Sequence, residues 1–318
     1  MVPRLPGPIG RAYVGLFLAA FGWAAAFVAA KIAVGHFSPG TAAALRQLTA
    51  LMVILPFAWR AWPPADLYGA LLPLAVFAIA GGACFQWTFM AAVRETSVTN
   101  AALLMALNPV LTVALAPLVG ESVTRRRLVG LGLALTGAAI VITRGDPAAL
   151  AAIGSSGRGD ALALAAAGFW ACVNIASRRV VGRVPNSLAN ACNYGVGGCV
   201  LLLLALPEDP YAQLATAPLW ALGALLFMVL CGSIMAGQFF LYGVHRVGVG
   251  RTAVFIYMVP VLTALLSALV LGEPLLASQV VGGAAVLLGV YVSSAAGRAA
   301  ISGRQPEAAR RAERPTEA

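Results

Sequence analysis

Long apolar runs alternate with short polar breaks along most of the chain. A membrane-spanning helix needs about 20 consecutive apolar residues, and each run is close to that length. The breaks contain turn-forming residues, as in Ser38-Pro39-Gly40 and Gly145-Asp146-Pro147. The pattern predicts an all-α integral membrane protein with ten transmembrane helices, at about 12–34, 40–60, 67–92, 98–119, 126–144, 160–180, 187–206, 217–244, 252–271 and 277–296.

The composition of the chain narrows its class further. Of its 318 residues, 61% are hydrophobic and 10% are charged, whereas soluble domains have about 45–50% apolar and about 25% charged residues. A soluble enzyme and a large extramembrane module are therefore excluded. The net charge of +10 is spread over the gaps between apolar runs, without interleaved aromatic residues. The sequence thus predicts a lipid bilayer, and no nucleic acid, as its surroundings.

The distribution of Lys and Arg predicts the orientation. If the N-terminus is inside, 16 of these residues fall on the inner side and four on the outer side, which the positive-inside rule favours. Both termini are then cytoplasmic, with residues 1–11 and 298–318 inside and a periplasmic linker over 145–159. The run Tyr13 to Val34 is longer than the core of a signal peptide, about 7–15 residues, which disfavours cleavage. We expect a multi-pass protein of the bacterial inner membrane.

The two halves of the chain, 12–144 and 160–297, share rare residues in the same order. Each half has five predicted helices, an odd number, so the second half should be inserted in the opposite orientation. Inverted repeats of this kind are typical of secondary transporters that work by alternating access. The matched pairs are Trp23 with Trp170, Lys31 with Arg178 and Arg46 with Asn193 at an offset of 147; Pro109 with Pro260 at 151; and Gln86 with Gln238, Arg94 with Arg246 and Glu121 with Glu273 at 152.

Specific motifs make each half similar to a known domain. The second half contains Tyr257-x-x-Pro260, Leu271-Gly272-Glu273 and the pair Gly282 and Gly289. The first half repeats them as Asn108-Pro109-Val110, Val119-Gly120-Glu121 and the pair Gly130 and Gly137. The chain resembles two tandem EamA domains of the drug/metabolite transporter superfamily. The resemblance implies an exporter of small metabolites such as amino acids, including aromatic or hydrophobic ones.

Arg46 is the clearest charge inside a predicted span, about seven residues from its start. An uncompensated Arg near a helix centre costs at least about 2.5–3.5 kcal/mol, so Arg46 should face protein or a wet cavity. It could bind a substrate carboxylate. A structural role is favoured, either snorkelling to the outer interface or bonding to a neighbouring helix end, because the span lacks a partner acid.

Further polar and aromatic residues in the spans are candidates for the transport path. Gln86 and Gln238 can donate and accept hydrogen bonds, which suits a zwitterion, but bonds between helices would explain them equally well. The same two interpretations apply to Asn174 and Asn193. The aromatic candidates, which could line an apolar cavity or simply pack in the core, are Trp23, Trp87, Trp170, Tyr194, Tyr242 and Tyr257.

Pro109 and Pro260 lie inside the fourth and ninth spans. Each removes a backbone hydrogen bond and should bend its helix, which predicts either a pair of hinges or static kinks. The pairs Gly130/Gly137 and Gly282/Gly289 are seven residues apart and predict faces of close helix approach. Those faces could serve the scaffold or a dimer, so the chain could be a monomer or a homodimer.

All acidic residues fall in loops, in the tail or at span ends. Because proton-driven carriers use an intramembrane acid or His, we expect no coupling through a buried carboxylate. Proton- or sodium-coupled efflux of drugs or other metabolites, a channel and an intramembrane enzyme remain as alternatives. The enzyme is disfavoured because the chain has no H-E-x-x-H, G-x-S-x-G or P-loop motif. No catalytic residue, cofactor or metal site is expected; the five cysteines form no C-x-x-C and have no His at ligand spacing.

Overall fold

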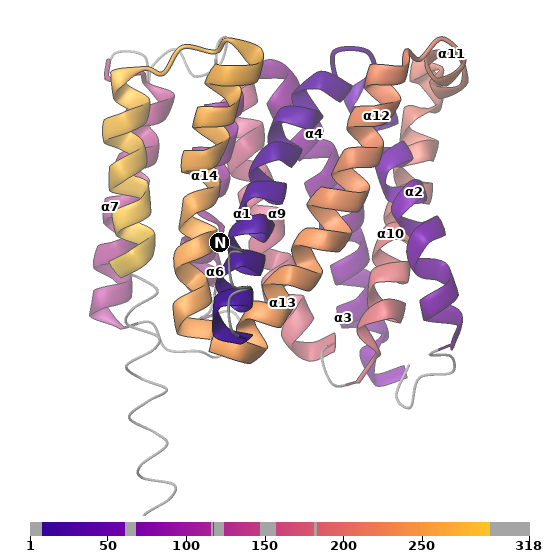
Figure 1. Ribbon diagram of the computed structural model, residues 1–318, viewed down its shortest axis with the longest axis horizontal. Helices are drawn as coiled ribbons and strands as arrows, with labels where there is room; N and C mark the ends of the chain where they lie inside the picture. Colours follow the sequence, from indigo (N-terminus) through magenta and orange to yellow (C-terminus); the bar gives the residue numbers. More distant parts are fainter. Residues whose placement is uncertain are drawn as a thin grey trace, which may run out of the picture.

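The computed structural model describes residues 8–60, 68–115, 117, 124–146, 157–180, 183–247 and 249–292, and all regular structure in these residues is helical. The helices stand side by side in one bundle, with α7 at one edge and α2 at the opposite edge (Figure 1). The numbered α-helices are α1 (Pro8–Ala33), α2 (Pro39–Arg60), α3 (Leu71–Val76), α4 (Phe85–Glu95), α5 (Val98–Met105), α6 (Asn108–Leu115), α7 (Arg125–Ile142), α9 (Arg158–Val180), α10 (Asn186–Ala205), α11 (Pro210–Ala215), α12 (Leu219–Phe227), α13 (Ala236–Val247) and α14 (Val249–Leu271).

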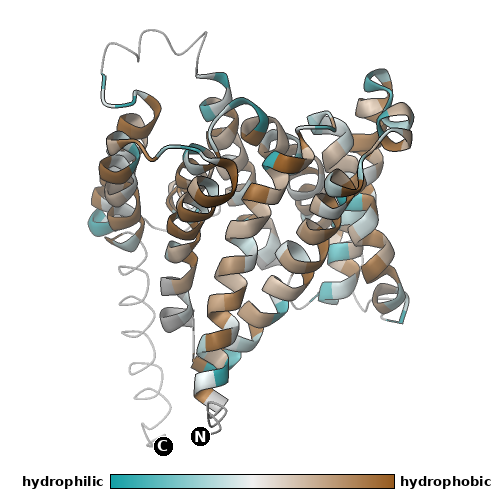
Figure 2. Ribbon diagram, turned by 45° about the horizontal axis from the view of Figure 1, so that its top comes forward, coloured by the Kyte–Doolittle hydropathy of each residue, from teal (hydrophilic) through white to brown (hydrophobic). Residues whose placement is uncertain are grey.

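Helix lengths and apolar character match those of an integral membrane protein. Within the described residues, seven helical stretches are long and apolar enough to cross a membrane. Three shorter apolar helices follow the same pattern: Leu128–Ile142, Phe255–Leu271 and the last described helix, Ala277–Val292. Each of these ten stretches coincides with one predicted span. Hydrophobic residues cover the bodies of the helices, and hydrophilic residues gather mainly at their ends and in the loops (Figure 2).

Two stretches contain a π-helical insertion that the hydrophobic pattern did not predict. The segment η2 (Phe77–Cys84) joins α3 to α4, and η6 (Met228–Met235) joins α12 to α13. Each has eight residues, and their positions differ by 151, which is one of the offsets of the internal repeat. π-Helical turns are rare in proteins, and a large share of those that exist lie at functional sites.

The two prolines have different effects on their helices. At Pro109 the helical stretch is interrupted, because α5 ends at Met105 and α6 begins at Asn108. Pro109 therefore lies in the first turn of α6, where its missing N–H is tolerated. Pro260 lies inside α14, which continues through it. The sequence predicted similar bends at the two prolines. The structure has an interrupted helix at Pro109 and an unbroken helix through Pro260.

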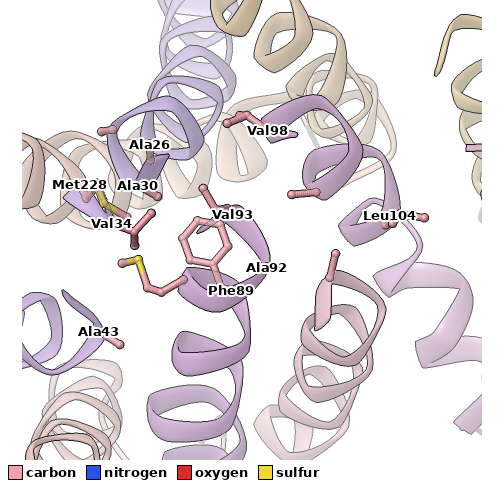
Figure 3. Close-up of a cluster of buried hydrophobic side chains, with 14 of the residues drawn as sticks. Ala26, Ala30, Val34, Ala43, Phe89, Ala92, Val93, Val98, Leu104 and Met228 are labelled. Carbon is pink, nitrogen blue, oxygen red and sulfur yellow. The ribbon is translucent and has the colours of Figure 1, made fainter. Parts of the chain in front are cut away.

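Packing pairs helices that are far apart in the sequence. Helix α2 lies along α10, α1 lies against α13 and α14, and α4 lies against α9. The largest buried cluster joins α1, α4, α5 and η6, and Figure 3 shows Phe89 with Val93 of α4 in this cluster and Met228 near α1. A bundle built from these contacts has its core between the two halves of the chain.

The glycine pairs predicted from the sequence pack against each other within the chain. A Cβ atom added at Gly137 would lie 2.5 Å from the carbonyl oxygen of Gly282, and one added at Gly289 would lie 2.6 Å from that of Gly130. Only glycine allows α7 and the last described helix to approach this closely. These glycine faces therefore serve the scaffold of one chain.

Candidate functional site

Arg46 lies where the two halves of the chain meet. It projects from α2 and donates a hydrogen bond of 2.7 Å from Nη1 to Oε1 of Gln86 on α4. Its Nη2 donates a bond of 3.1 Å to Oγ of Ser233 in η6, in the second half. Among the described residues, Arg46 Nε is the buried side-chain nitrogen or oxygen that has no hydrogen-bond partner. Nε is therefore the nitrogen of this guanidinium whose N–H has no partner and is open to a ligand.

One aromatic ring, that of Phe89, lies against this guanidinium, and two further rings pack on Phe89. The Cζ atom of Arg46 lies 5.8 Å from the ring centroid of Phe89, close enough for a cation–π interaction. Phe27 meets Phe89 edge-on at 5.2 Å, and Phe85 stacks on it at 5.9 Å. Tyr194 of α10 is near enough to interact electrostatically with Arg46. The result is one positive charge in an apolar, aromatic setting.

A second set of polar contacts lies beside Arg46, where α10 crosses η2. Asn193 Nδ2 donates a bond of 2.9 Å to the carbonyl oxygen of Phe77. Gln47 Nε2 donates a bond of 3.0 Å to the carbonyl oxygen of Gly82 and lies 3.5 Å from Asn193 Oδ1. These bonds use the π-helical backbone of η2 as acceptor, so Asn193 and Gln47 have structural partners.

The structure separates Gln86 from Gln238, which the sequence placed at equivalent positions. Gln86 is buried against Arg46, whereas Gln238 is exposed on α13. Tyr242, one turn further along α13, is also exposed, and Arg246 lies over its ring. The site at Arg46 thus includes Gln86 of the first half and does not include the equivalent Gln238 of the second half.

The remaining candidates divide between the neighbourhood of Arg46 and other places. Trp170 is 37% exposed and contacts Phe85 with 4.7 Å between ring centroids, so it extends the aromatic group. Asn174 bonds Thr112 Oγ1 of α6 at 3.1 Å. Trp23 packs against Phe240 on α13. Trp87 and Tyr257 are half-buried residues that pack against the main hydrophobic cluster.

Sequence reasoning missed three residues of the site, Gln47, Ser233 and Phe89. Gln47 is only 1% exposed and follows Arg46 directly, so an uncharged polar residue within a span was the available signal. Ser233 lies in an apolar run and resembles an ordinary small residue of a helix interface. Phe89 had no distinguishing signal, because phenylalanines are frequent in these spans.

The carboxylates of the described residues lie at helix ends or in loops, as the sequence predicted. Asp160, in the first turn of α9, is 7% exposed and accepts a bond of 2.6 Å from Thr96 Oγ1 and one of 3.2 Å from Asn100 Nδ2. Glu273 accepts bonds from the backbone N–H of Val98 and from Ser267 Oγ. Both acids therefore join the second half to the junction between α4 and α5.

Comparison with known proteins assigns the fold to transporters. A solved crystal structure aligns with 90% of this chain and 97% of its own, with a TM-score of 0.58 at 19% sequence identity, which shows a shared fold. The uncharacterised transporter YyaM of Bacillus subtilis is 30% identical over 273 residues, covering 85% of this chain and 89% of its own.

Two more distant relatives have names that describe export. A probable terminal-alkyne amino-acid exporter of Streptantibioticus cattleyicolor is 27% identical, over 89% of this chain and 93% of its own. A probable amino-acid metabolite efflux pump of Salmonella typhimurium is 26% identical, over 85% and 90%. The EamA-like transporter family matches twice, at residues 10–143 and 157–295. The chain therefore belongs to the EamA-like transporter family, with two EamA domains, and is a multi-pass membrane transporter and not an enzyme.

Proposed function

We propose that this protein exports small carboxylate-bearing metabolites, amino acids among them, by alternating access. Its ten spans form two five-span halves, 12–144 and 160–297, of opposite orientation, with both termini in the cytoplasm of a bacterium. Arg46 binds the carboxylate of the substrate, and the aromatic cluster of Phe89, Phe27 and Phe85 beside it favours substrates with aromatic or other hydrophobic side chains. The protein acts as a monomer or a homodimer in the inner membrane.

The observation that carries this proposal is the unpartnered Nε of Arg46 in a buried, aromatic setting between the halves. A buried donor without a partner is costly, so a ligand that accepts from it gains affinity. Charge-assisted bonds between guanidinium and carboxylate are among the strongest hydrogen bonds in proteins. The names of the two exporting relatives support amino acids as the class of substrate.

Transport into proteoliposomes tests the proposal. A panel of L-amino acids is compared with the corresponding amides, which lack the negative charge. We expect several acids, and none of the amides, to be transported and to show trans-stimulation in counterflow, which a channel does not show.

The variant Arg46→Gln tests the role of the guanidinium directly. It should lower transport about tenfold or more, because a hydrogen bond to a charged group contributes about 1.5–3 kcal/mol. Arg60→Gln, at the exposed end of the same helix, is the matched control and should transport at the wild-type rate. Equal transport of acids and amides, or full activity of Arg46→Gln, would contradict the proposal.

A further inference from the structure

Ser233 is the contact that the second half makes with the guanidinium of Arg46. Its hydroxyl accepts the bond of 3.1 Å from Arg46 Nη2 and lies 3.3 Å from the carbonyl oxygen of Met228, one π-helical turn earlier. η6 itself is held against α1, because a Cβ atom at Gly232 would lie 2.7 Å from that of Ala26. The Arg46–Ser233 bond thus joins α2 of the first half to a segment packed on α1.

The three nitrogens of the guanidinium are unequally occupied. Nη1 is bound to Gln86 within the first half, Nη2 is bound to Ser233, and Nε is unpartnered. A carboxylate binds arginine best with two parallel bonds. The edge that includes the unpartnered Nε also includes Nη2. A carboxylate on that edge would accept from Nε and from Nη2, the nitrogen that the Ser233 hydroxyl already contacts at 3.1 Å, so the two acceptors crowd the same nitrogen. An ionised carboxylate is the stronger acceptor and should win.

The internal repeat relates the crossing of α2 with η6 to a second helix crossing, which is built differently. There α10 meets η2, and Gly82 takes the place of Ser233 at the offset of 151. A Cβ atom at Gly82 would lie 2.2 Å from the carbonyl oxygen of Asn193, so this crossing is tight. Asn193 and Gln47 close it with neutral amide groups that donate to backbone carbonyl groups, and these amides carry no charge to attract a carboxylate. The crossing of α2 and η6 instead depends on a side-chain bond to a charge.

We propose that Ser233 is a positioning residue that holds Arg46 when the site is empty and is displaced by the substrate carboxylate, so that binding releases α2 from η6. This inference rests on the proposed function, because it takes Arg46 as the carboxylate ligand. Substrate occupancy is thereby linked to relative movement of the two halves, and Ser233 acts through Arg46 without binding the substrate.

The test measures binding and transport separately for Ser233→Ala in the full-length protein. The probe is the amino acid of the panel that binds the wild type most tightly in nanodiscs. Without the competing hydroxyl, Ser233→Ala should lower Kd about three- to tenfold, the range of a typical net hydrogen bond. Its maximal transport rate should fall, because binding no longer releases a contact. Ser233→Thr keeps the hydroxyl and should restore both values.

Two further variants make the result decisive. Ser233→Cys places a weak acceptor at the same site and should show the same direction of change if Ser233→Ala does not fold. Thr136→Ala removes an exposed hydroxyl on α7 that bonds its own helix, and it should change neither value.

The outcomes separate this inference from the proposed function. A higher Kd in Ser233→Ala would mean that Ser233 binds the substrate itself. An unchanged Kd and an unchanged transport rate would mean that Ser233 only packs between helices. Either result overturns the inference. If Arg46→Gln abolishes binding while Ser233→Ala behaves as the wild type, the inference alone fails. If Arg46→Gln binds normally, or no amino acid of the panel binds the wild type, the proposed function fails and the inference fails with it.

Discussion

At the scale of single residues, three polar side chains bond to backbone carbonyl groups of neighbouring helices. Gln47 and Asn193 do so at η2, and Lys31 does so at the end of α4. Arg46 differs, because its partners are side chains and one of its nitrogens has none. A side-chain partner can move without unfolding a helix, so Arg46 is suited to exchange partners during transport.

Lys31, in the last turn of α1, bonds to the end of a neighbouring helix. Its Nζ donates to the carbonyl oxygens of Val93 and Thr96 at 2.8 and 2.9 Å, which satisfies the carboxyl end of α4. Lys31→Met should therefore lower the free energy of unfolding by about 1–3 kcal/mol, because those carbonyl groups lose a charged donor.

Thermal unfolding in detergent measures the effect of Lys31→Met, with Lys31→Arg as the conservative control that keeps a charged donor. Cysteine labelling from either side of the membrane should show unchanged orientation in both variants. A changed orientation with normal stability would mean that Lys31 sets the topology of its helix and does not stabilise the end of α4.

At the scale of elements, the two π-helical segments are the parts that hydrophobic periodicity does not reveal. Each segment widens its helix because its backbone hydrogen bonds join residues i and i+5. The number of residues in the span and their apolar content stay the same. The consequences differ, since η2 packs tightly on α10 through Gly82 and Gly197, and η6 contacts α2 less closely. A similar contrast separates the interruption at Pro109 from the continuous helix at Pro260.

The tight crossing of α10 and η2 gives a prediction about glycine. A Cβ atom at Gly197 would lie 2.3 Å from the carbonyl carbon of Gly82, and both contacts are with backbone that cannot yield. Gly82→Ala and Gly197→Ala should each lower the free energy of unfolding by about 1–3 kcal/mol, the usual cost of overpacking.

The matched control for these glycine variants is Gly223→Ala in α12, where the added methyl group meets nothing within 4 Å. It should be neutral or stabilising by up to about 1 kcal/mol, because alanine favours helix. Denaturant or thermal unfolding of the three variants under the same conditions measures these changes in the free energy of unfolding. Equal stability of Gly197→Ala and Gly223→Ala would mean that the crossing is looser than described.

At the scale of the whole molecule, contacts between the halves occur in related pairs. Helix α1 lies on α13 as α9 lies on α4, and α1 lies on α14 as α9 lies on α5 and α6. The crossings of α2 with η6 and of α10 with η2 depart from this equivalence. Unequal crossings in two related halves support the proposal of alternating access, in which one side opens while the other is closed.

The placement of the acids leads to a prediction about energy coupling. In the described part of the chain, carboxylates are at helix ends or in loops, and buried Asp160 has neutral donors as partners. A proton relay needs an acid or His within the path. A pH gradient alone should therefore not drive accumulation of a transported amino acid in proteoliposomes beyond its equilibrium level.

The control for the coupling experiment is the same vesicle with an outward gradient of unlabelled substrate, which should drive accumulation by counterflow. Accumulation driven by the pH gradient alone would show proton coupling. In that case Asp160→Asn and Glu273→Gln would be the first variants to compare with the wild type.

The sequence by itself determined the positions of the apolar helices and the kinship with EamA domains. Both depend on local patterns, namely the length of an apolar run, the turn residues between runs and motifs of adjacent residues. The repeat was also readable, because rare residues such as Trp, Gln and Glu recur in order.

Only the tertiary structure decided which polar residues meet. Gln86 and Gln238 are equivalent in the repeat, but one is buried on Arg46 and the other is exposed. Ser233 and Phe89, which had no distinguishing signal, became part of the site. The physical reason is that hydropathy places a residue inside the membrane, whereas the rotation and crossing of helices, changed here by π-helical segments and glycine contacts, set which face it occupies and what it touches.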